Sequence, residues 1–377
     1  MTEYEPVIGL EIHAQLRTRT KMFCSCPAEF GAEPNTHVCP VCLGLPGALP
    51  VVNERAVEYA VKMGVATNCR IARRSVFARK NYFYPDCPKN YQITQYEIPL
   101  CSGGYMTAGE HAEKIRIMRI HLEEDAAKLV HPGGEADASY VDMNRAGVPL
   151  IEIVTEPDIR TPAQAARVAE KLRSILKSLD ICDGNMEEGS LRCDVNVSVR
   201  KTGTASIGVS TEIKNLNSFK AVERALEFEI QTQTKTLRDG NTVSHMTLLW
   251  DAGTLTCREM RVKEAADDYR YFPDPDLRAL DVPEELAARV RSEMPELPDA
   301  KADRFVTELG LPRYDANLLT DTRELADYFE AVAGACGDAK TASNWVMGEV
   351  LRELNERRVD IDGLRVTPER LARLIAA

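Results

Sequence analysis

The sequence has no apolar run long enough to span a membrane, and its start, Met-Thr-Glu-Tyr-Glu, lacks the basic residues and apolar core of a secretory signal peptide. It also has no excess of positive charge, because 47 lysines and arginines stand against 58 aspartates and glutamates and give a net charge of -11. This balance argues against nonspecific binding of nucleic acid through bulk charge, although it is compatible with a local basic patch. We therefore expect a cytoplasmic protein.

The Gly-x-x-x-x-Gly-Lys-Ser/Thr loop of Walker-type ATPases is absent as well, so a nucleotide would have to bind in another way. A disulfide framework is not expected, since the 11 cysteines are odd in number and no signal peptide is found. The cysteines fit reduced thiols together with a metal site. A chain of 377 residues with 44% hydrophobic and 28% charged residues predicts a soluble globular protein of about two or three domains.

What the sequence does contain is a strand pattern with an unusual polar face at residues 191–200. Apolar and polar residues alternate strictly there, which predicts a half-buried β-strand. The polar face carries Arg192, Asp194, Asn196, Ser198 and Arg200. Two guanidinium groups beside a carboxylate, an amide and a hydroxyl can hold a metal ion together with phosphate oxygens. For this strand taken alone, an ordinary solvent-exposed face is the simpler interpretation.

Three further segments show the same alternation, each with ligand-type residues on one face: Glu11 and His13, His121 and Glu123, and Glu212 and Lys214. The run of acids in the second segment adds to this picture, because consecutive Glu123, Glu124 and Asp125 repel one another unless they are solvated or hold a cation. Together the four segments predict an antiparallel sheet curved round a polar cradle. Its carboxylates would hold Mg²⁺ and its basic groups would hold ATP on the sheet face.

Four cysteines near the N-terminus form two close pairs, Cys24 with Cys26 and Cys39 with Cys42. Two such pairs across a short loop can place four thiolates around one tetrahedral Zn²⁺, and the proline and glycine around the second pair suit a tight turn. Because all four ligands would be sulfur, no position is open for a substrate, and the site is expected to be structural. The alternative is four unrelated buried cysteines, since Cys24-x-Cys26 is tighter than the commonest zinc spacing.

Residues 81–91 form an aromatic and proline-rich stretch that directly follows a cluster of basic residues at 70–80. Such a segment can meet a phosphate or stack on a base, but a packed loop is an equal alternative. Amphipathic periodicity predicts helices over residues 53–67, 163–179, 219–235, 284–294, 299–309, 323–335 and 341–356. Thr161 and Pro162 are the expected N-cap and first residue of the second of these helices.

Six blocks of sequence, spread in order over essentially the whole chain, are more specific than any single pattern: residues 7–13, 79–86, 141–152, 186–194, 214–218 and 268–276. They read VIGLEIH, RKNYFYPD, VDMNRAGVPLIE, MEEGSLRCD, KNLNS and DYRYFPDPD. These blocks resemble the signatures of the GatB family, which comprises the B subunits of the bacterial tRNA-dependent aspartyl/glutamyl amidotransferases.

The resemblance implies an α+β fold. Residues 1–290 would form an antiparallel-sheet cradle of glutamine-synthetase/guanidino-kinase type with a zinc knuckle at 24–42, a feature of only some family members. Residues 291–377 would form part of an all-α domain. The tail domain that helps the family to grip tRNA is not recognised in this sequence, which puts full tRNA affinity in doubt.

The resemblance also implies a reaction. ATP would activate the side-chain carboxylate of glutamate misacylated on tRNA(Gln), or of aspartate misacylated on tRNA(Asn), as an acyl phosphate, and ammonia would displace the phosphate. The implied cofactors are ATP, Mg²⁺ and structural Zn²⁺. The implied partners are the misacylated tRNA and the two other members of a heterotrimer, a small protein and an amidase. The amidase supplies ammonia, because this chain shows no amidase Ser-Ser-Lys constellation.

The family's functional residues can be carried over position by position. Those matching the magnesium and ATP pocket are Glu11, His13, Glu124, Asp194 and Glu212, with Glu123 beside them. Those matching the exit of the ammonia channel are Lys80, Tyr82 and Lys89. Arg192, Asn196 and Lys214 are expected to bind the nucleotide or substrate, because they extend the same polar faces.

Two other classes of function are compatible with parts of the sequence. A non-catalytic, zinc-stabilised RNA-binding module would use the basic and aromatic stretch but would leave the polar strand faces unexplained. A small-molecule amide ligase acting on a free amino acid would need no helical extension. Measuring ATP hydrolysis, and its dependence on aminoacylated tRNA, distinguishes the tRNA-dependent amidotransferase from the RNA-binding module and from the small-molecule ligase.

Overall fold

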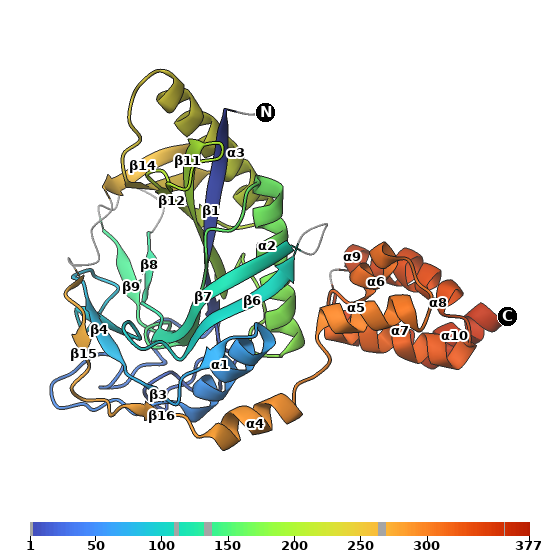
Figure 1. The fold of residues 1–377 in the computed structure, drawn as a ribbon. Coiled ribbons are helices and arrows are strands. Elements are labelled where there is room, and N and C mark those ends of the chain that lie inside the picture. The colour runs from blue at the N-terminus through green and yellow to red at the C-terminus, as the bar shows by residue number, and fades with distance from the viewer. Residues whose placement is uncertain (1–2, 109–112, 132–137, 263–268, 358) are drawn as a thin grey trace. The chain divides into compact units, whose positions relative to one another are not determined.

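A computed structural model describes residues 3–108, 113–131, 138–262, 269–357 and 359–377 (Figure 1). The chain divides into two compact units. The sheet unit comprises residues 1–173 and 181–293, and the helical unit comprises residues 174–180 and 294–377. Asp268, the first residue of the sixth sequence block, lies outside the described residues. Within the described ranges, no helix has both the length and the apolar character needed to cross a membrane.

The sheet unit is built around one large, mostly antiparallel sheet of nine strands. Its strands follow the order β14-β13-β12-β11-β1-β10-β7-β6-β2. Their bounds are β1 Tyr4–Gln15, β2 Arg70–Ile71, β6 Cys101–Ala108, β7 Glu113–Glu124, β10 Pro149–Thr155, β11 Leu191–Lys201, β12 Thr211–Leu216, β13 Met246–Asp251 and β14 Thr256–Val262. The predicted strand at 191–200 is therefore confirmed as β11, and the mixed composition of helices and a large antiparallel sheet agrees with the expected class.

Only the pairing of β12 with β13 is parallel among the described strands of this sheet. A parallel pair needs a long crossover connection, and helix α3 (Phe219–Arg238) supplies it. The helix begins at Ser218, whose side-chain oxygen accepts a hydrogen bond from the backbone N–H of Ala221. It packs against β11 and β12, so that it covers the sheet side opposite the polar face.

The alternation in the sequence decides which face of each central strand is buried. In β1, Ile8, Leu10, Ile12 and Ala14 are at most 1% exposed, whereas Glu11 and His13 on the other face are half-buried. Burying each large apolar side chain stabilises the fold by roughly 1.5–3 kcal/mol. The apolar face is covered by helices, among them α1 (Glu54–Ala66), which packs against β6 and β7.

Helix α2 (Pro162–Ser178) lies alongside the sheet on the side away from β8 and β9 (Figure 1). Its start is as expected, because the Thr161 hydroxyl accepts a hydrogen bond from the backbone N–H of Gln164 at 3.1 Å. Small two- and three-stranded sheets border the open side of the large sheet. Their strands are β3 Arg74–Ser75, β4 Ala78–Asn81, β5 Tyr91–Thr94, β8 Lys128–Val130, β9 Tyr140–Asp142, β15 Phe272–Pro273 and β16 Leu280–Asp281.

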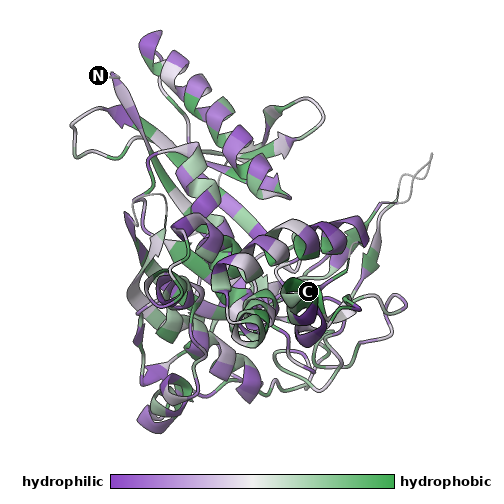
Figure 2. Cartoon of the chain, turned by 90° about the vertical axis from the view of Figure 1, so that its right-hand side faces the viewer, coloured by the Kyte–Doolittle hydropathy of each residue, from purple (hydrophilic) through white to green (hydrophobic). Residues whose placement is uncertain are grey.

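The helical unit and the segment before it contain short helices. Their bounds are α4 Glu284–Ser292, α5 Pro298–Thr307, α6 Arg313–Leu319, α7 Arg323–Cys336, α8 Ala339–Trp345, α9 Leu351–Arg357 and α10 Pro368–Ala376. Figure 2 shows hydrophilic and hydrophobic residues mixed along the helices of the chain. A π-helical turn, Val346–Val350, joins α8 to α9, and a short 3-10 turn, Ile361–Gly363, precedes α10. The core of the helical unit surrounds Phe305 and Phe329, which meet edge to face at 5.0 Å.

The helix predicted over 341–356 is thus interrupted by a π turn, and two helices were not predicted from the sequence. Helix α6 spans only seven residues, too few for periodicity to be visible. Helix α10 carried a signal that was available, because Thr367 caps it and Pro368 is its first residue, as at Thr161 and Pro162.

Candidate active site

The polar faces of the central strands, together with the segments beside them, form a cavity of about 560 Å³, which we call the cradle pocket. It lies entirely within the sheet unit. Its ionisable and aromatic lining residues are Glu11, His13, Lys80, Tyr82, Tyr84, Asp86, Tyr96, Arg119, His121, Glu123, Glu152, Glu212, Lys214, Tyr269 and Tyr271. Carboxylates, histidines and cationic side chains therefore converge in one place, while tyrosines form much of the wall.

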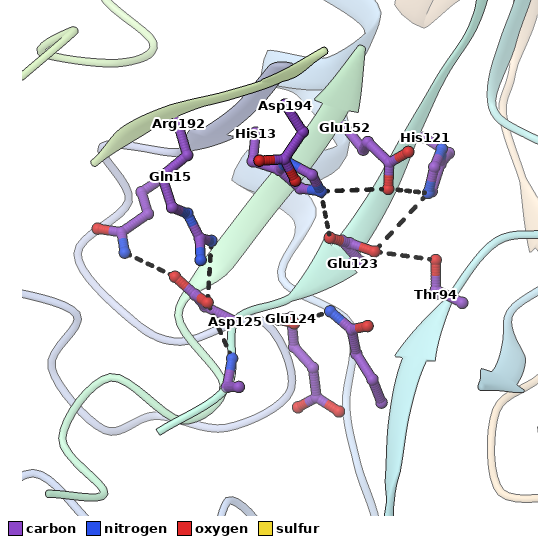
Figure 3. A network of polar contacts seen from close by, with 12 residues as sticks. His13, Gln15, Thr94, His121, Glu123, Glu124, Asp125, Glu152, Arg192 and Asp194 are labelled. Carbon is purple, nitrogen blue, oxygen red and sulfur yellow. Dashed lines mark hydrogen bonds and ion pairs between the residues drawn. The ribbon is translucent and has the colours of Figure 1, made fainter. Parts of the chain in front are cut away.

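One row of side chains crosses three neighbouring strands of the pocket. In the sheet register His13 of β1 lies opposite Glu152 of β10, which in turn lies opposite His121 of β7. Figure 3 shows the two imidazoles on either side of the Glu152 carboxylate. The distances from Glu152 Oε2 are 3.4 Å to His13 Nε2 and 3.5 Å to His121 Nε2. Cross-strand neighbours on one face of an antiparallel sheet meet in this way.

Glu123 completes this group from β7. Its Oε1 lies 3.8 Å from His13 Nε2, and its Oε2 lies 3.7 Å from His121 Nε2. The Thr94 hydroxyl donates a hydrogen bond to Glu123 Oε2 at 3.3 Å and so fixes the carboxylate from β5. The side chain of Glu123 is only 4% exposed. We call His13, Glu123 and Glu152 the acid–histidine cluster.

The charges in the acid–histidine cluster shift the protonation of its members. Burial alone would lower the pKa of His13, but the hydrogen bond with Glu152 and the nearby charges of Glu152 and Glu123 raise it to about 9. Burial would raise the pKa of Glu152, yet the two imidazoles hold it well below its usual range. At neutral pH the imidazole of His13 is therefore protonated and the Glu152 carboxylate is ionised, so that a metal ion binding here would have to displace the proton of His13.

The donor atoms of the cluster fit a metal ion, since one ligand atom each from His13, Glu123 and Glu152 lie within 4.8 Å of one another. Carboxylate oxygens are the ligands that Mg²⁺ prefers, and it usually keeps several waters besides one or two carboxylates. Glu152 was not among the magnesium ligands predicted from the sequence. In the sequence, Glu152 is the single charged residue of β10 and the last residue of the block at 141–152.

A second polar group lies beside the cluster on β11 and β12. Lys214 Nζ is 2.5 Å from Asp194 Oδ2 and 3.1 Å from Glu212 Oε1, while Asn196 donates a hydrogen bond to Glu11 Oε1 at 2.7 Å. Asp194 lies opposite Glu11 in the register of β11 with β1. Burial, followed by the charges of neighbouring carboxylates, raises the pKa of Glu11. The structure thus brings together four of the residues expected at the nucleotide pocket and one lysine that balances their charge.

Glu124 departs from the expected magnesium set. It follows Glu123 on β7, so its side chain points to the other side of the strand, away from the acid–histidine cluster (Figure 3). There it forms an ion pair with Lys89, and its Oε1 also accepts a hydrogen bond from the backbone N–H of Ile93 at 3.0 Å. The structure does not bring Glu124 to the other expected ligands.

Arg192 also lies outside the lining of the cradle pocket, although it neighbours His13 in the register. It donates a hydrogen bond to Asp125 Oδ1 at 3.0 Å, and Gln15 donates to Asp125 Oδ2 at 2.7 Å. Burial would raise the pKa of Asp125, but the charges of Arg192 and Arg145 lower it below its usual range. Arg192 is therefore held by an internal carboxylate at the edge of the pocket.

Two more cavities lie behind the cradle pocket within the sheet unit. A cavity of about 220 Å³ is lined by residues of the cysteine-rich segment together with Lys89 and Glu124. A cavity of only about 10 Å³ lies between the two larger ones, because it shares Tyr82, Asp86 and Gln92 with the cradle pocket and Lys89, Tyr91 and Glu124 with the other. Lys80 and Tyr82 thus face the cradle pocket, whereas Lys89 lines the small cavity and the cavity beyond it.

The four cysteines gather as the sequence predicts. The Sγ atoms of Cys24, Cys26, Cys39 and Cys42 lie within 4.8 Å of one another, with 3.9 Å between Cys39 and Cys42. Four sulfurs on a zinc ion at about 2.3 Å would be about 3.8 Å apart, so the cluster fits Zn²⁺. The hydrogen bond between Cys24 and Cys42 is the main cause that lowers the pKa of the Cys42 thiol to about 4. A thiolate at neutral pH is the form that binds zinc.

We expect the purified protein to carry about one equivalent of Zn²⁺, and Cys42→Ser to remove it, because a closed thiolate site can contribute roughly 10 kcal/mol or more to local folding. Metal analysis of protein never exposed to a chelator measures this. Cys336→Ser is the control, since Cys336 lies in the helical unit and outside the cluster. Folded wild-type protein without zinc would contradict the prediction.

Comparison with known proteins places the chain in a family. The family model described as "GatB/GatE catalytic domain" matches residues 6–288, and the family model described as "GatB domain" matches residues 327–377. The B subunit of aspartyl/glutamyl-tRNA(Asn/Gln) amidotransferase from Chlorobium phaeobacteroides is 57% identical over 374 residues, which cover 99% of this chain and 78% of that protein. The proteins of the same name from Thermodesulfovibrio yellowstonii and Moorella thermoacetica are 56% and 54% identical over 376 residues, with 99% of this chain and 78% and 79% of those proteins covered. The chain therefore belongs to the GatB family of amidotransferase B subunits.

Proposed function

We propose that this chain catalyses the ATP-dependent transamidation of Glu-tRNA(Gln), Asp-tRNA(Asn) or both. In the first step the γ-phosphoryl group of ATP moves to an oxygen of the misacylated side-chain carboxylate, and ADP leaves. In the second step the nitrogen of ammonia attacks the acyl carbon, phosphate leaves, and the nitrogen loses a proton to give the amide. The names of the relatives motivate this reaction and its tRNA substrates.

The observation that carries the proposal is the acid–histidine cluster at the floor of a cavity with cationic groups around it. Mg²⁺ would be held by His13, Glu123 and Glu152, and when bound it would offset the charge of the triphosphate. Glu11, Asp194 and Glu212 form a second acidic row beside it, which we assign to orienting the nucleotide and its metal. The fold type of this unit, a cradle of glutamine-synthetase/guanidino-kinase type, is part of the same proposal.

Three cationic side chains are placed to meet phosphate oxygens. Burial would lower the pKa of Lys80, but Tyr271, Glu123 and Glu152 raise it, so Lys80 is charged at neutral pH. Lys214 is likewise kept charged, because Asp194 and Glu212 raise its pKa against the effect of burial. Arg119 lines the pocket, and its buried Nε has no hydrogen-bond partner among the described residues. A phosphate oxygen would satisfy such a donor.

The row of cavities supports a route for ammonia into the cradle pocket. The small cavity shares Lys89 and Glu124 with the cavity beside the cysteines, and it shares Tyr82 and Asp86 with the cradle pocket. The proposed route passes through all three cavities. A cavity of about 10 Å³ barely admits one water-sized molecule, which suits ammonia and excludes larger nucleophiles. We assign the supply of ammonia to an amidase partner, in a heterotrimer that also contains a small third protein.

The experiment that tests the function measures ATP cleavage by this chain together with its amidase and small partner proteins. We expect ADP to form with Glu-tRNA(Gln) or Asp-tRNA(Asn), and we expect uncharged tRNA to support at most a few per cent of that rate. A chain that binds RNA but never cleaves ATP would instead be a zinc-stabilised RNA-binding module. Cleavage that depends on free glutamate or aspartate without tRNA would indicate a small-molecule amide ligase.

A further inference from the structure

The turn that carries the last two zinc-binding cysteines lies directly against Lys89. Gly44, two residues after Cys42, has a φ of +66° and no side chain. A Cβ atom at this position would lie 2.5 Å from Cγ of Lys89 and 3.3 Å from its Cα. Contacts this short do not occur in proteins, so the aliphatic part of Lys89 packs directly against the Gly44 backbone and occupies the space that a side chain at position 44 would need. The side chain of Lys89 therefore reaches Glu124 across the surface of the cysteine turn.

A second glycine brings the same turn close to Glu124. A Cβ atom at Gly147 would lie 3.5 Å from Cβ of Cys42, 3.5 Å from Cδ of Lys21 and 3.8 Å from Oε2 of Glu124. Gly147 is also tied to the cysteine-rich segment, because its carbonyl accepts a hydrogen bond from the backbone N–H of Met22 at 2.7 Å. Both members of the Lys89–Glu124 ion pair thus lie against residues next to Cys42.

The buried side chain of Lys21 links the cysteine-rich segment to the turn before β10. This side chain is wholly buried, and its Nζ donates hydrogen bonds to the carbonyls of His37 at 2.7 Å and Met143 at 3.3 Å. The same ammonium group lies 3.7 Å from Cys42 Sγ. A buried cation needs such partners, and the thiolate charge of the cysteine cluster is one of them. The position of Lys21 therefore depends on both the cysteine cluster and the turn before β10.

We propose that the zinc knuckle, residues 24–42, together with the adjoining Leu43 and Gly44, is a positioning element for the Lys89–Glu124 ion pair. With the four thiolates bound to one metal ion, the 39–44 turn is fixed, and its contact at Gly44 holds the stem of Lys89 in reach of Glu124. Without the metal, no common ion links the four sulfur atoms, so the turn is released and the ion pair loses its supporting surface. The consequence for ammonia transfer rests on the proposed function, whereas the coupling between zinc and Lys89 does not.

The coupling is tested by chemical acetylation of lysines, read by mass spectrometry, on zinc-loaded protein and on protein from which zinc has been removed. Lys89 is 11% exposed and ion-paired, so its acetylation requires local opening, and we expect its rate to rise about tenfold without zinc. Lys301 is the matched control, because it is 12% exposed, ion-paired with Asp327 and located in the helical unit. Equal Lys89 rates with and without zinc would overturn the proposal.

Two glycine variants test the contact with zinc in place. Gly44→Ala and Gly47→Ala introduce the same methyl group at positions with φ of +66° and +84°, but nothing lies within 4 Å of a Cβ at Gly47. Both variants therefore carry backbone strain, and only Gly44→Ala displaces Lys89. We expect Gly44→Ala to retain zinc and to raise the acetylation rate of Lys89 several-fold, with Gly47→Ala unchanged. If metal removal unfolds the whole sheet unit, this pair of variants decides the question, and equal Lys89 rates in both would overturn the proposal.

The activity arm separates this inference from the proposed function. A displacement of about 1 Å near a reacting group can lower a rate on the order of a hundredfold, so Gly44→Ala should reduce glutamine-driven amide formation at least tenfold relative to Gly47→Ala. Supplying free ammonia should restore it to within about twofold. If the wild-type protein does not cleave ATP, the proposed function is contradicted. The coupling between zinc and Lys89 is not affected by that result, because acetylation is measured without activity.

Discussion

Glu152→Gln is expected to abolish both tRNA-dependent ATP cleavage and amide formation, by about a hundredfold or more, which corresponds to about 2.7 kcal/mol of transition-state stabilisation. Glutamine keeps the shape of the side chain but removes the anionic oxygen that faces His13 and His121 at 3.4 and 3.5 Å. Free ammonia should not rescue the activity, since the defect lies in the phosphoryl-transfer step. Steady-state assays of ADP and amide formation, with glutamine and with ammonia, measure the effect.

Glu156→Gln is the matched control, because Glu156 follows β10 directly and does not line the cradle pocket. A second readout tests the metal assignment without catalysis. Binding of Mn²⁺, followed by water-proton relaxation, should weaken at least tenfold in Glu152→Gln and remain unchanged in Glu156→Gln. Activity of Glu152→Gln within a few fold of wild type would show that the acid–histidine cluster is not the centre of the reaction.

Asp194→Asn is expected to cause a loss of similar size, on the order of a hundredfold or more in both ATP cleavage and amide formation. The substitution is nearly isosteric, but an amide offers one neutral oxygen where the carboxylate offers two anionic ones. It also breaks the 2.5 Å ion pair with Lys214, which leaves that lysine to Glu212 alone. Zinc content and the thermal unfolding midpoint should stay close to those of the parent protein.

The control for Asp194→Asn is Asp303→Asn, which removes the same charge from an exposed ion pair with Arg313 in the helical unit. Exposed pairs contribute only about 0–1 kcal/mol, so this variant should be fully active. If Asp194→Asn retains activity within a few fold, the polar face of β11 does not take part in catalysis. The RNA-binding interpretation of the chain would then be the better one.

Much of the sheet could be predicted from the sequence because its central strands each bury one face. Strict alternation places Ile8, Leu10 and Ile12 in the core and leaves Glu11 and His13 opposite them. Every residue of such a strand is assigned to a face once the strand is recognised, since its side chains repeat every two residues. Five of the expected site residues line the cradle pocket for this reason: Glu11, His13, Glu123, Glu212 and Lys214. Lys80 and Tyr82 also line it, but they were expected from the resemblance to the family.

The composition of the acid–histidine cluster could not be predicted, because it depends on how separate strands are aligned. Glu152 is the only acid in β10, and nothing within that strand distinguishes it from a solvent-exposed carboxylate. Its role follows from a register that pairs it with His13 on one side and His121 on the other. The expected role of Glu124 came from the resemblance to the family, whereas alternation along β7 places its side chain opposite to that of Glu123, where it pairs with Lys89.

The place of β1 in the sheet has a consequence for synthesis of the protein on the ribosome. β1 is made well before its two sheet partners, which are β10, Pro149–Thr155, and β11, Leu191–Lys201. At about 5–20 residues per second, the nascent β1 waits on the order of ten seconds or more before both partners have been made. During that time its apolar face and both hydrogen-bonding edges are available to other chains. Ribosome-bound chains that stop before residue 191 should therefore be the most prone to aggregation, and the most dependent on chaperones.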